Sequence, residues 1–220
     1  STGISGTDGS AATPAVQGAD NNTGMFFPAA DTIAFSEGGT EVLRLNASGN
    51  AVFTGTIQVA GITTDIYPRV LGTAVASTSG TSIDFTGIPS WVRRVTVMFN
   101  GVSTNGTNTP LVQLGAGSIT SSGYVSAASS SDGTTVSTST AGFVVRSAAA
   151  TNALTGPLTI STIGSNIWVI AGSLYNSAAG GVTTTTTGGV TLAGALDRVR
   201  ITTVGGTDTF DAGSVNILWE

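Results

Sequence analysis

The stretch Arg94-Val95-Thr96-Val97-Met98-Phe99-Asn100 indicates the fold class of this chain. Side chains alternate between the two faces of a β-strand, so Val95, Val97 and Phe99 share one face. The same period of two recurs in residues 198–202 and 214–219. We therefore predict that these strands bury their apolar faces in one common core, formed by Val95, Val97, Phe99, Val199, Ile201, Val215, Ile217 and Trp219.

Residues 69–220 as a whole have the pattern of one all-β domain. Short apolar and β-branched runs are interrupted every few residues by Gly, Ser or Thr, which is typical of short strands joined by tight turns. Strands are expected at residues 70–76, 81–85, 92–100, 111–115, 142–146, 158–163, 167–174, 190–192, 198–204 and 215–219. This spacing predicts an antiparallel β-sandwich of the jelly-roll type. We use the word head only as a label for residues 69–220.

The composition excludes several classes of function. The 220 residues include 37 Thr, 31 Gly and 25 Ser, and all seven basic residues are Arg, with no Lys, His or Cys. These absences exclude catalysis by a Ser-His-Asp or Cys-His site and by a Schiff-base Lys. They also exclude a nucleotide-binding P-loop Lys and a zinc site with Cys or His ligands. The net charge of −5 argues against nucleic acid as a partner. No apolar run approaches the roughly 20 residues of a membrane-spanning helix, and the first residues show no signal peptide.

Residues 1–68 form a different, Gly-rich segment. Turns are expected at residues 37–40 and 46–50, and strands at residues 41–45 and 51–59. So small a segment cannot build a sufficient core of its own. Three copies packed around an axis would cover its apolar side chains, which are Phe26, Phe27, Ile33, Phe35, Leu43 and Leu45. We place the boundary between this segment and the head near Pro68.

Low-complexity segments interrupt the head at residues 126–140 and 180–189, the second with a Thr183–Thr187 run. We interpret both as long surface turns or edge strands. The alternative is variable contact loops at one pole of the sandwich, because binding sites favour loops on a rigid scaffold. Recognition would then lie on polar loops around residues 103–110, 121–140 and 178–189.

Two parts of the chain resemble a known family. Within residues 19–50, the run Asp31-Thr32-Ile33-Ala34-Phe35-Ser36-Glu37-Gly38-Gly39-Thr40-Glu41-Val42-Leu43-Arg44-Leu45 is similar to a repeat-like module of bacteriophage tail-fibre and tail-spike proteins. Residues 88–107, which begin Ile88-Pro89-Ser90-Trp91, and residues 196–220 resemble the C-terminal head of phage fibre proteins.

The resemblance implies a virion fibre protein, made in the bacterial cytoplasm and located on the tail or head of the particle. It implies a homotrimer whose N-terminal segment, residues 1–68, attaches to other virion proteins. The head, residues 69–220, would bind a host cell-surface polysaccharide or protein without catalysis, cofactor or membrane insertion. Two alternatives remain open: a structural head fibre or decoration protein with no receptor, and a glycan-depolymerising spike.

Four residues are the candidate receptor contacts. Tyr124 follows Gly123 at the start of a polar stretch. Asn105, Asn108 and Asp132 lie in segments rich in Ser, Thr and Gly. Their amide, carboxylate and hydroxyl groups are suited to hydrogen bonds with sugars.

Asp208 and Asp211 are the candidate ligands of a cation. They lie three residues apart between Gly205-Gly206 and Gly213. We interpret them first as turn residues whose carboxylates cap backbone amides. A calcium site is an alternative, because hard cations take carboxylate and carbonyl oxygens, and a glycosidase pair is another.

The remaining aromatic and basic residues have structural interpretations. Trp168 and Trp219 are expected in the core, and Trp91 half exposed at the start of a strand. The arginines of the head are expected to lie in a subunit interface or to pair at the surface with carboxylates such as Asp84 and Asp197. These arginines are Arg93, Arg94, Arg198 and Arg200.

Overall fold

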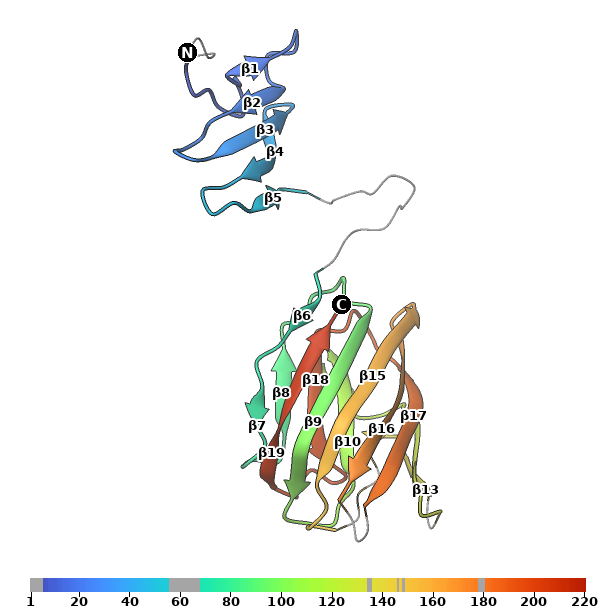
Figure 1. Cartoon of the computed structure of the whole chain (residues 1–220). Coiled ribbons are helices and arrows are strands. Elements are labelled where there is room, and N and C mark those ends of the chain that lie inside the picture. The colour runs from blue at the N-terminus through green and yellow to red at the C-terminus, as the bar shows by residue number, and fades with distance from the viewer. Residues whose placement is uncertain (1–5, 56–67, 134–135, 146, 148, 178–180) are drawn as a thin grey trace. The chain divides into compact units, whose positions relative to one another are not determined.

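A computed structural model of the chain describes residues 6–55, 68–133, 136–145, 147, 149–177 and 181–220. Its secondary structure consists of antiparallel β-strands, which confirms the predicted all-β class (Figure 1). The chain divides into two compact units, Ser1–Ile66 and Tyr67–Glu220, and each is described by itself.

The N-terminal unit is a five-stranded sheet whose strands follow one another in sequence order. They are β1 (Val16–Gln17), β2 (Gly24–Phe26), β3 (Ile33–Glu37), β4 (Thr40–Leu45) and β5 (Ala51–Phe53). The β3–β4 hairpin turns at Gly38 and Gly39, whose φ angles of 56° and 80° favour glycine. The predicted turn at residues 37–40 is therefore confirmed. Of the strand expected at residues 51–59, β5 is observed and residues 56–59 lie outside the described part of the chain.

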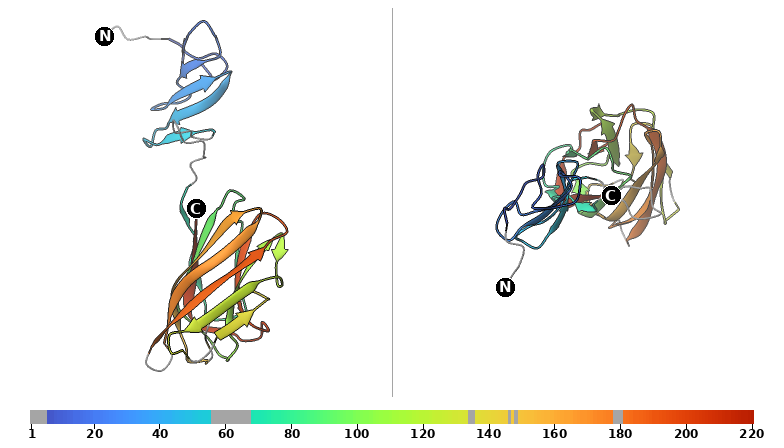
Figure 2. Two further views of the ribbon diagram at one scale, coloured as in Figure 1. Left: turned by 90° about the vertical axis from the view of Figure 1, so that its right-hand side faces the viewer. Right: turned by 90° about the horizontal axis from the view of Figure 1, so that it is seen from above.

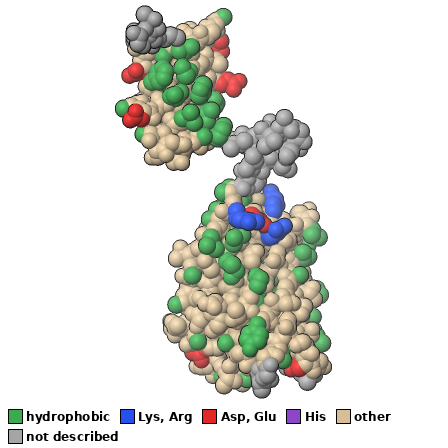
Figure 3. Space-filling view, in the orientation of Figure 1, with side chains coloured by type: hydrophobic (Ala, Val, Ile, Leu, Met, Phe, Trp, Pro, Cys, Tyr) green, Lys and Arg blue, Asp and Glu red, His purple; other side chains and the backbone are tan. Residues whose placement is uncertain are grey.

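One face of this sheet is apolar and open to solvent. The strand register aligns Val16, Met25, Phe35, Leu43 and Phe53 in one row across all five strands. In the next row Ile33 pairs with Leu45. We call these seven side chains the apolar face; Leu45 is 42% exposed and Phe53 47%. Figure 3 shows hydrophobic side chains gathered on one side of the unit.

The opposite face of the same sheet is partly buried. Phe26 is 4% exposed and Ala34 is not exposed at all. The expectation that one copy of this segment leaves its apolar side chains uncovered is therefore wrong for Phe26. The expectation is confirmed for Ile33, Phe35 and Leu45, which remain exposed. A five-stranded sheet has two faces, and the rest of this small unit packs against only one of them.

The C-terminal unit is a sandwich of two unequal sheets (Figures 1 and 2). The larger, nine-stranded sheet has the order β13 (Val136–Ser139), β12 (Val125–Ser130), β17 (Val182–Thr191), β16 (Ile167–Asn176), β15 (Leu154–Gly164), β9 (Arg94–Thr104), β19 (Phe210–Trp219) and β6 (Val70–Leu71), with β7 (Val75–Ala76) also paired to β19. The smaller sheet has the order β11 (Ser118–Ile119), β10 (Pro110–Ala116), β18 (Arg198–Thr203) and β8 (Ile83–Thr86), with β14 (Phe143–Val144) paired to β10.

One hydrophobic core lies between the two sheets. It contains the alternating side chains that defined the predicted core face, including Val97, Val199 and Val215, each with no exposed surface. Trp219 is partly buried and packs against this core. The prediction of a single shared core is thus confirmed for all eight residues.

The low-complexity segments are strands rather than loops. Residues 126–140 contain β12 and β13, and β13 lies at the sheet edge as one interpretation predicted. Most of residues 180–189 belong to β17, an interior strand, so the interpretation as surface turns, edge strand or loop is wrong there. The inward Thr hydroxyls are satisfied by backbone carbonyls: Thr186 Oγ1 donates to Val144 at 3.1 Å and Thr184 Oγ1 to Ser129 at 3.3 Å. Threonine can therefore occupy inward positions without an unpaired hydroxyl.

Candidate functional site

The strand register gives the sandwich two distinct ends. Val102, Leu154, Asn176 and Val182 lie at one level across β9, β15, β16 and β17. Three turns follow at that level, at residues 105–109, 131–133 and 205–209, and we call this the loop end. The opposite end carries Arg94 and Glu220, and the C-terminus lies there next to β6, the first strand of the unit (Figure 1).

Asn105 and Asn108 both hold the loop end together. The Asn105 backbone N–H donates to the Thr209 carbonyl at 2.9 Å, and the Asn105 side-chain oxygen accepts from the Thr209 N–H at 2.9 Å. Asn108 donates to the Asp208 carboxylate twice, from its backbone N–H at 2.7 Å and from Nδ2 at 2.6 Å. These bonds tie two turns that lie about a hundred residues apart, so both side chains have a structural role at this end.

The Asp208 carboxylate is largely buried, at 9% exposure, and is used within the protein. The capping interpretation is confirmed for Asp208, although the amide that it caps belongs to a distant turn. Asp211 instead accepts a hydrogen bond from the Ser103 hydroxyl. Among the described residues, no third His, Cys, Asp or Glu lies close enough to these two carboxylates to complete a metal site.

Asp132 lies at the exposed tip between β12 and β13. The tip is fixed by backbone hydrogen bonds from Ser131 to the Thr183 carbonyl at 2.8 Å and from Gly133 to the Ser130 carbonyl at 3.1 Å. Of the four predicted contacts, Asn105, Asn108 and Asp132 thus lie at the same end of the sandwich, although the β12–β13 tip is four strands away from the turn after β9. Nothing in their sequence spacing revealed this, because strand pairing brings them there.

Tyr124 is not an exposed contact, and that part of the prediction is wrong. Its side chain is 1% exposed and its ring packs edge-on against Phe143, with ring centroids 5.0 Å apart. The hydroxyl accepts a hydrogen bond from the Leu114 N–H at 2.7 Å. Burial raises the pKa of this phenol to about 12. The neighbouring Gly123 suggested a loop, but the chain turns there into the core.

Charged side chains of the C-terminal unit form ion pairs. Arg200 pairs with Asp84 at 2.6 Å and Arg198 with Asp197 at 2.7 Å, as the sequence analysis anticipated. The hydrogen bond from Arg198 lowers the pKa of Asp197 below its ordinary value. A pairing that the sequence did not reveal is found at the opposite end, where the Glu220 carboxylate accepts hydrogen bonds from both Arg69 and Arg94.

The tryptophans lie as predicted. Trp168 is 3% exposed within the core, and Trp91 and Trp219 are partly buried against it. None of the three is therefore an open aromatic platform of the kind on which a sugar ring stacks.

Comparison with known proteins identified no relative: no protein-family model, curated protein or solved structure matches the chain. Among the described residues, no helical segment has the length and apolar composition that crossing a bilayer requires.

Proposed function

We propose that this chain is a virion fibre protein that assembles as a homotrimer through its N-terminal unit and binds a host cell surface, without catalysis, through the loop end of its C-terminal unit. The host partner would be a surface polysaccharide or protein. The N-terminal unit would also attach the fibre to other virion proteins.

The observation that carries this proposal is the apolar face of the N-terminal sheet. A row of apolar side chains crosses all five strands, and Phe35 and Leu45 remain 37% and 42% exposed. Apolar surface left in water is a free-energy cost that association removes, at about 25 cal/mol per Å². Three sheets that turn these faces toward a common axis would bury all three rows at once.

The loop end supports the second half of the proposal. Its turns are small, polar and rigidly tied, through Asn105, Asn108 and Asp208, to a well-packed sandwich. A rigid scaffold that presents short polar turns is a common arrangement for recognition. Three such ends held in one particle would bind cooperatively, and avidity can exceed single-site affinity by about 10²–10⁴.

The first test is the mass of the particle in solution. Light scattering should give about three times the 21.7 kDa of one chain. Leu45→Glu, on the apolar face, should lower that mass, because it buries a charge in the interface. Val204→Glu, an equally exposed apolar residue in the other unit, should not. A single-chain mass for the unaltered protein at micromolar concentration would contradict the assembly.

The second test is adsorption to bacteria. Labelled protein is first screened for a strain that binds it. Thr107→Arg, in the turn at residues 105–109, and Thr151→Arg, just before Leu154 at the same level, should then reduce binding, because both residues are exposed at the loop end. Thr86→Arg, an exposed threonine of the small sheet at the opposite end, is the matched control. Equal adsorption of all three variants would refute recognition at the loop end.

The same experiment separates the alternative functions. Release of reducing sugar from the strain would favour a glycan-depolymerising spike. Particle-bound protein without any cell adsorption would favour a structural head fibre or decoration protein.

A further inference from the structure

Five neighbouring strands of the large sheet contain no charged side chain. They are β13, β12, β17, β16 and β15, of four, six, ten, ten and eleven residues. Their outward side chains, for example Thr187 and its pairing partners Ala127 and Ala171, are small and neutral. We call the outward side chains of these five strands the neutral face.

Such neutrality is unusual for a surface in water. About 25% of the residues of a typical soluble protein are charged. Within this unit the small sheet carries the ion pairs of Asp84 with Arg200 and of Asp197 with Arg198. Figure 3 shows the large sheet from outside, with uncharged side chains over most of its surface and charged groups toward its two ends. The charge is therefore distributed unevenly between the two sheets.

Apolar side chains also project from the neutral face. Val125 is 79% exposed, Val136 63% and Tyr175 55%. Depletion of charge together with exposed apolar and aromatic side chains distinguishes the centre of a protein–protein interface from the rest of a surface.

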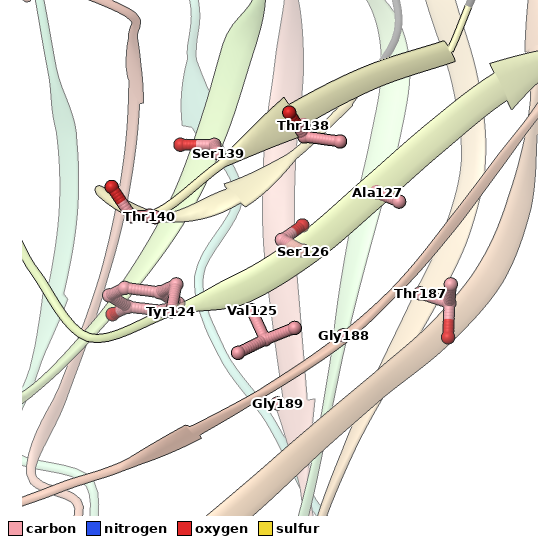
Figure 4. A pocket seen from close by; sticks show the side chains of 10 residues that line it. All are labelled: Tyr124, Val125, Ser126, Ala127, Thr138, Ser139, Thr140, Thr187, Gly188 and Gly189. Carbon is pink, nitrogen blue, oxygen red and sulfur yellow. The ribbon is translucent and has the colours of Figure 1, made fainter.

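A hollow of about 710 Å³ lies on this face, over β12, β13 and β17 (Figure 4). Gly189 stands between Val125 and Val169 in the strand register and contributes no side chain there. A Cβ at Gly189 would meet its first neighbour, the Trp168 carbonyl oxygen, at 3.6 Å, an ordinary contact distance. The backbone therefore does not require glycine at this position, and the missing side chain leaves space beside the projecting Val125.

The size of the neutral face is close to that of a stable interface. At a rise of roughly 3.3 Å per residue and a spacing of roughly 4.8 Å between strands, its five strands project about 650 Å². Each partner in a standard protein–protein interface buries about 800 Å². Side chains add relief to the projected area, so the face is large enough for one partner.

The chemistry of the face selects a second copy as that partner. Thr and Ser hydroxyls both donate and accept hydrogen bonds, so a hydroxyl-rich face is complementary to itself. A second copy also brings no charge that would be buried without a counter-ion, whereas an ordinary protein surface would bring several. The hollow beside Gly189 offers room for an apolar side chain such as the partner's Val125.

We infer that, within the trimer, the C-terminal units of two of the three copies pack against each other through the neutral face, since a self-complementary face pairs two copies and leaves the third unpaired. The inference rests on the proposed fibre assembly, which holds the copies at high local concentration. It adds a second interface, separate from the apolar face of the N-terminal unit, and leaves the loop end free for recognition.

Cross-linking of single cysteines tests this inference cleanly, because the chain has no cysteine of its own. Thr187→Cys places a thiol on β17, the central strand of the neutral face, and Thr86→Cys places one on the outer face of the small sheet. Both replace an exposed threonine. Each full-length variant is first shown by light scattering to have the mass of the unaltered protein and is then treated with a short bismaleimide.

We expect Thr187→Cys to give at least about tenfold more cross-linked chains than Thr86→Cys, since a defined interface raises the effective concentration of the paired thiols. Adding Ala171→Arg to Thr187→Cys should abolish the cross-link while the N-terminal interface keeps the mass unchanged.

The possible failures are distinguishable. One outcome is that the two cysteine variants are both associated in solution and cross-link equally, with complete maleimide labelling shown by mass spectrometry. That result overturns the inference but not the proposed assembly. If the thiol of the Thr187→Cys variant does not cross-link, and becomes protected from maleimide only when bacteria are added, the neutral face binds the receptor instead of a second copy. The inference is then overturned. A monomeric protein overturns both.

Discussion

Tyr124→Phe removes one buried oxygen atom and should measurably destabilise the C-terminal unit. On this side of β10, β14 pairs with Leu111 and Val112, and β11 pairs with Gly115 and Ala116. The Tyr124 hydroxyl accepts the Leu114 N–H between these two short strands, at 2.7 Å. It therefore replaces a missing strand partner.

The expected loss follows mainly from that hydrogen bond. The hydroxyl also donates to the Leu114 carbonyl at 3.4 Å, but this carbonyl keeps the Thr120 N–H as a donor at 2.9 Å. Phenylalanine keeps the ring contact with Phe143 but leaves the Leu114 N–H buried without an acceptor. A buried unsatisfied group costs about 1–3 kcal/mol. For a unit of this size that corresponds to a melting temperature lower by about 2–12 °C.

The pH dependence gives a second, independent signature. Burial raises the pKa of Tyr124 to about 12, whereas an exposed tyrosine titrates near pH 10. A raised pKa means that folding favours the neutral phenol, so its contribution is fully present below about pH 10 and is lost as the pH rises toward 12. The total loss is about 2–3 kcal/mol. Phenylalanine has no proton to lose, so the stability difference between the two proteins should narrow above pH 10.

Urea unfolding at pH 8 and at several values between pH 10 and 12 measures both effects. Tyr175→Phe is the control, because Tyr175 is 55% exposed and its loss should change stability little. If Tyr124→Phe unfolds at the same urea concentration as the parent and shows the same alkaline slope, the assigned role of the hydroxyl is wrong.

Three further predictions concern the rest of the unit. Phe99→Ala should cost about 3–5 kcal/mol in urea unfolding, because Phe99 is 3% exposed within the core; a loss well under 1 kcal/mol would contradict its position. Gly188→Ala should destabilise the unit strongly, because an added Cβ would lie 2.5 Å from the Val125 carbonyl oxygen of β12. Gly189→Ala should be nearly neutral, because there the first neighbour of a Cβ lies at 3.6 Å, an ordinary van der Waals distance. Thermal melts that rank the two variants in the other order would refute this. Glu220→Gln should make the free energy of unfolding less sensitive to acid below about pH 4.5. The hydrogen bond from Arg69 lowers the pKa of the Glu220 carboxylate in the folded protein, so the carboxylate stabilises the fold above its unfolded-state pKa and stops doing so as the pH falls through its folded-state pKa. Acid unfolding curves of parent and variant that run parallel would contradict this.

Alternation of side chains was enough to predict the core strands. Val95, Val97 and Phe99 alternate with residues of the opposite face, and the structure gives each of them 3% exposure or less. A strand that is half buried must show this period, whatever its neighbours are. The N-terminal turns were equally predictable, because Gly38-Gly39 adopts backbone angles that other residues avoid.

The threonine run of β17 shows where such reasoning stops. Thr183–Thr187 has no apolar alternation, although Thr184 and Thr186 are buried and Thr185 is exposed. Threonine serves on either face once a carbonyl is within reach of an inward hydroxyl, and that carbonyl comes from another strand. The sequence therefore carries no signal of an interior strand.

The candidate site depended on pairing in the same way. Asn105, Asn108 and Asp208 meet only because β9 and β19 pair along most of their length. Tyr124 was misassigned for a related reason, since a glycine before a tyrosine is compatible with either a loop or a turn into the core. Local patterns identify faces of strands, whereas contacts between distant segments require the topology.

The position of β19 has a consequence for how the C-terminal unit folds. This strand lies between β9 and the pair β6 and β7, so the first and last strands of the unit are hydrogen-bonded to each other. The large sheet cannot close until residues 210–219 have been synthesised, and the folding rate should be limited by contacts between distant segments. The N-terminal sheet, whose strands pair only with their sequence neighbours, has no such delay. During synthesis it can form before the sandwich does, so the apolar face is available to other copies while the C-terminal unit is still unfolded.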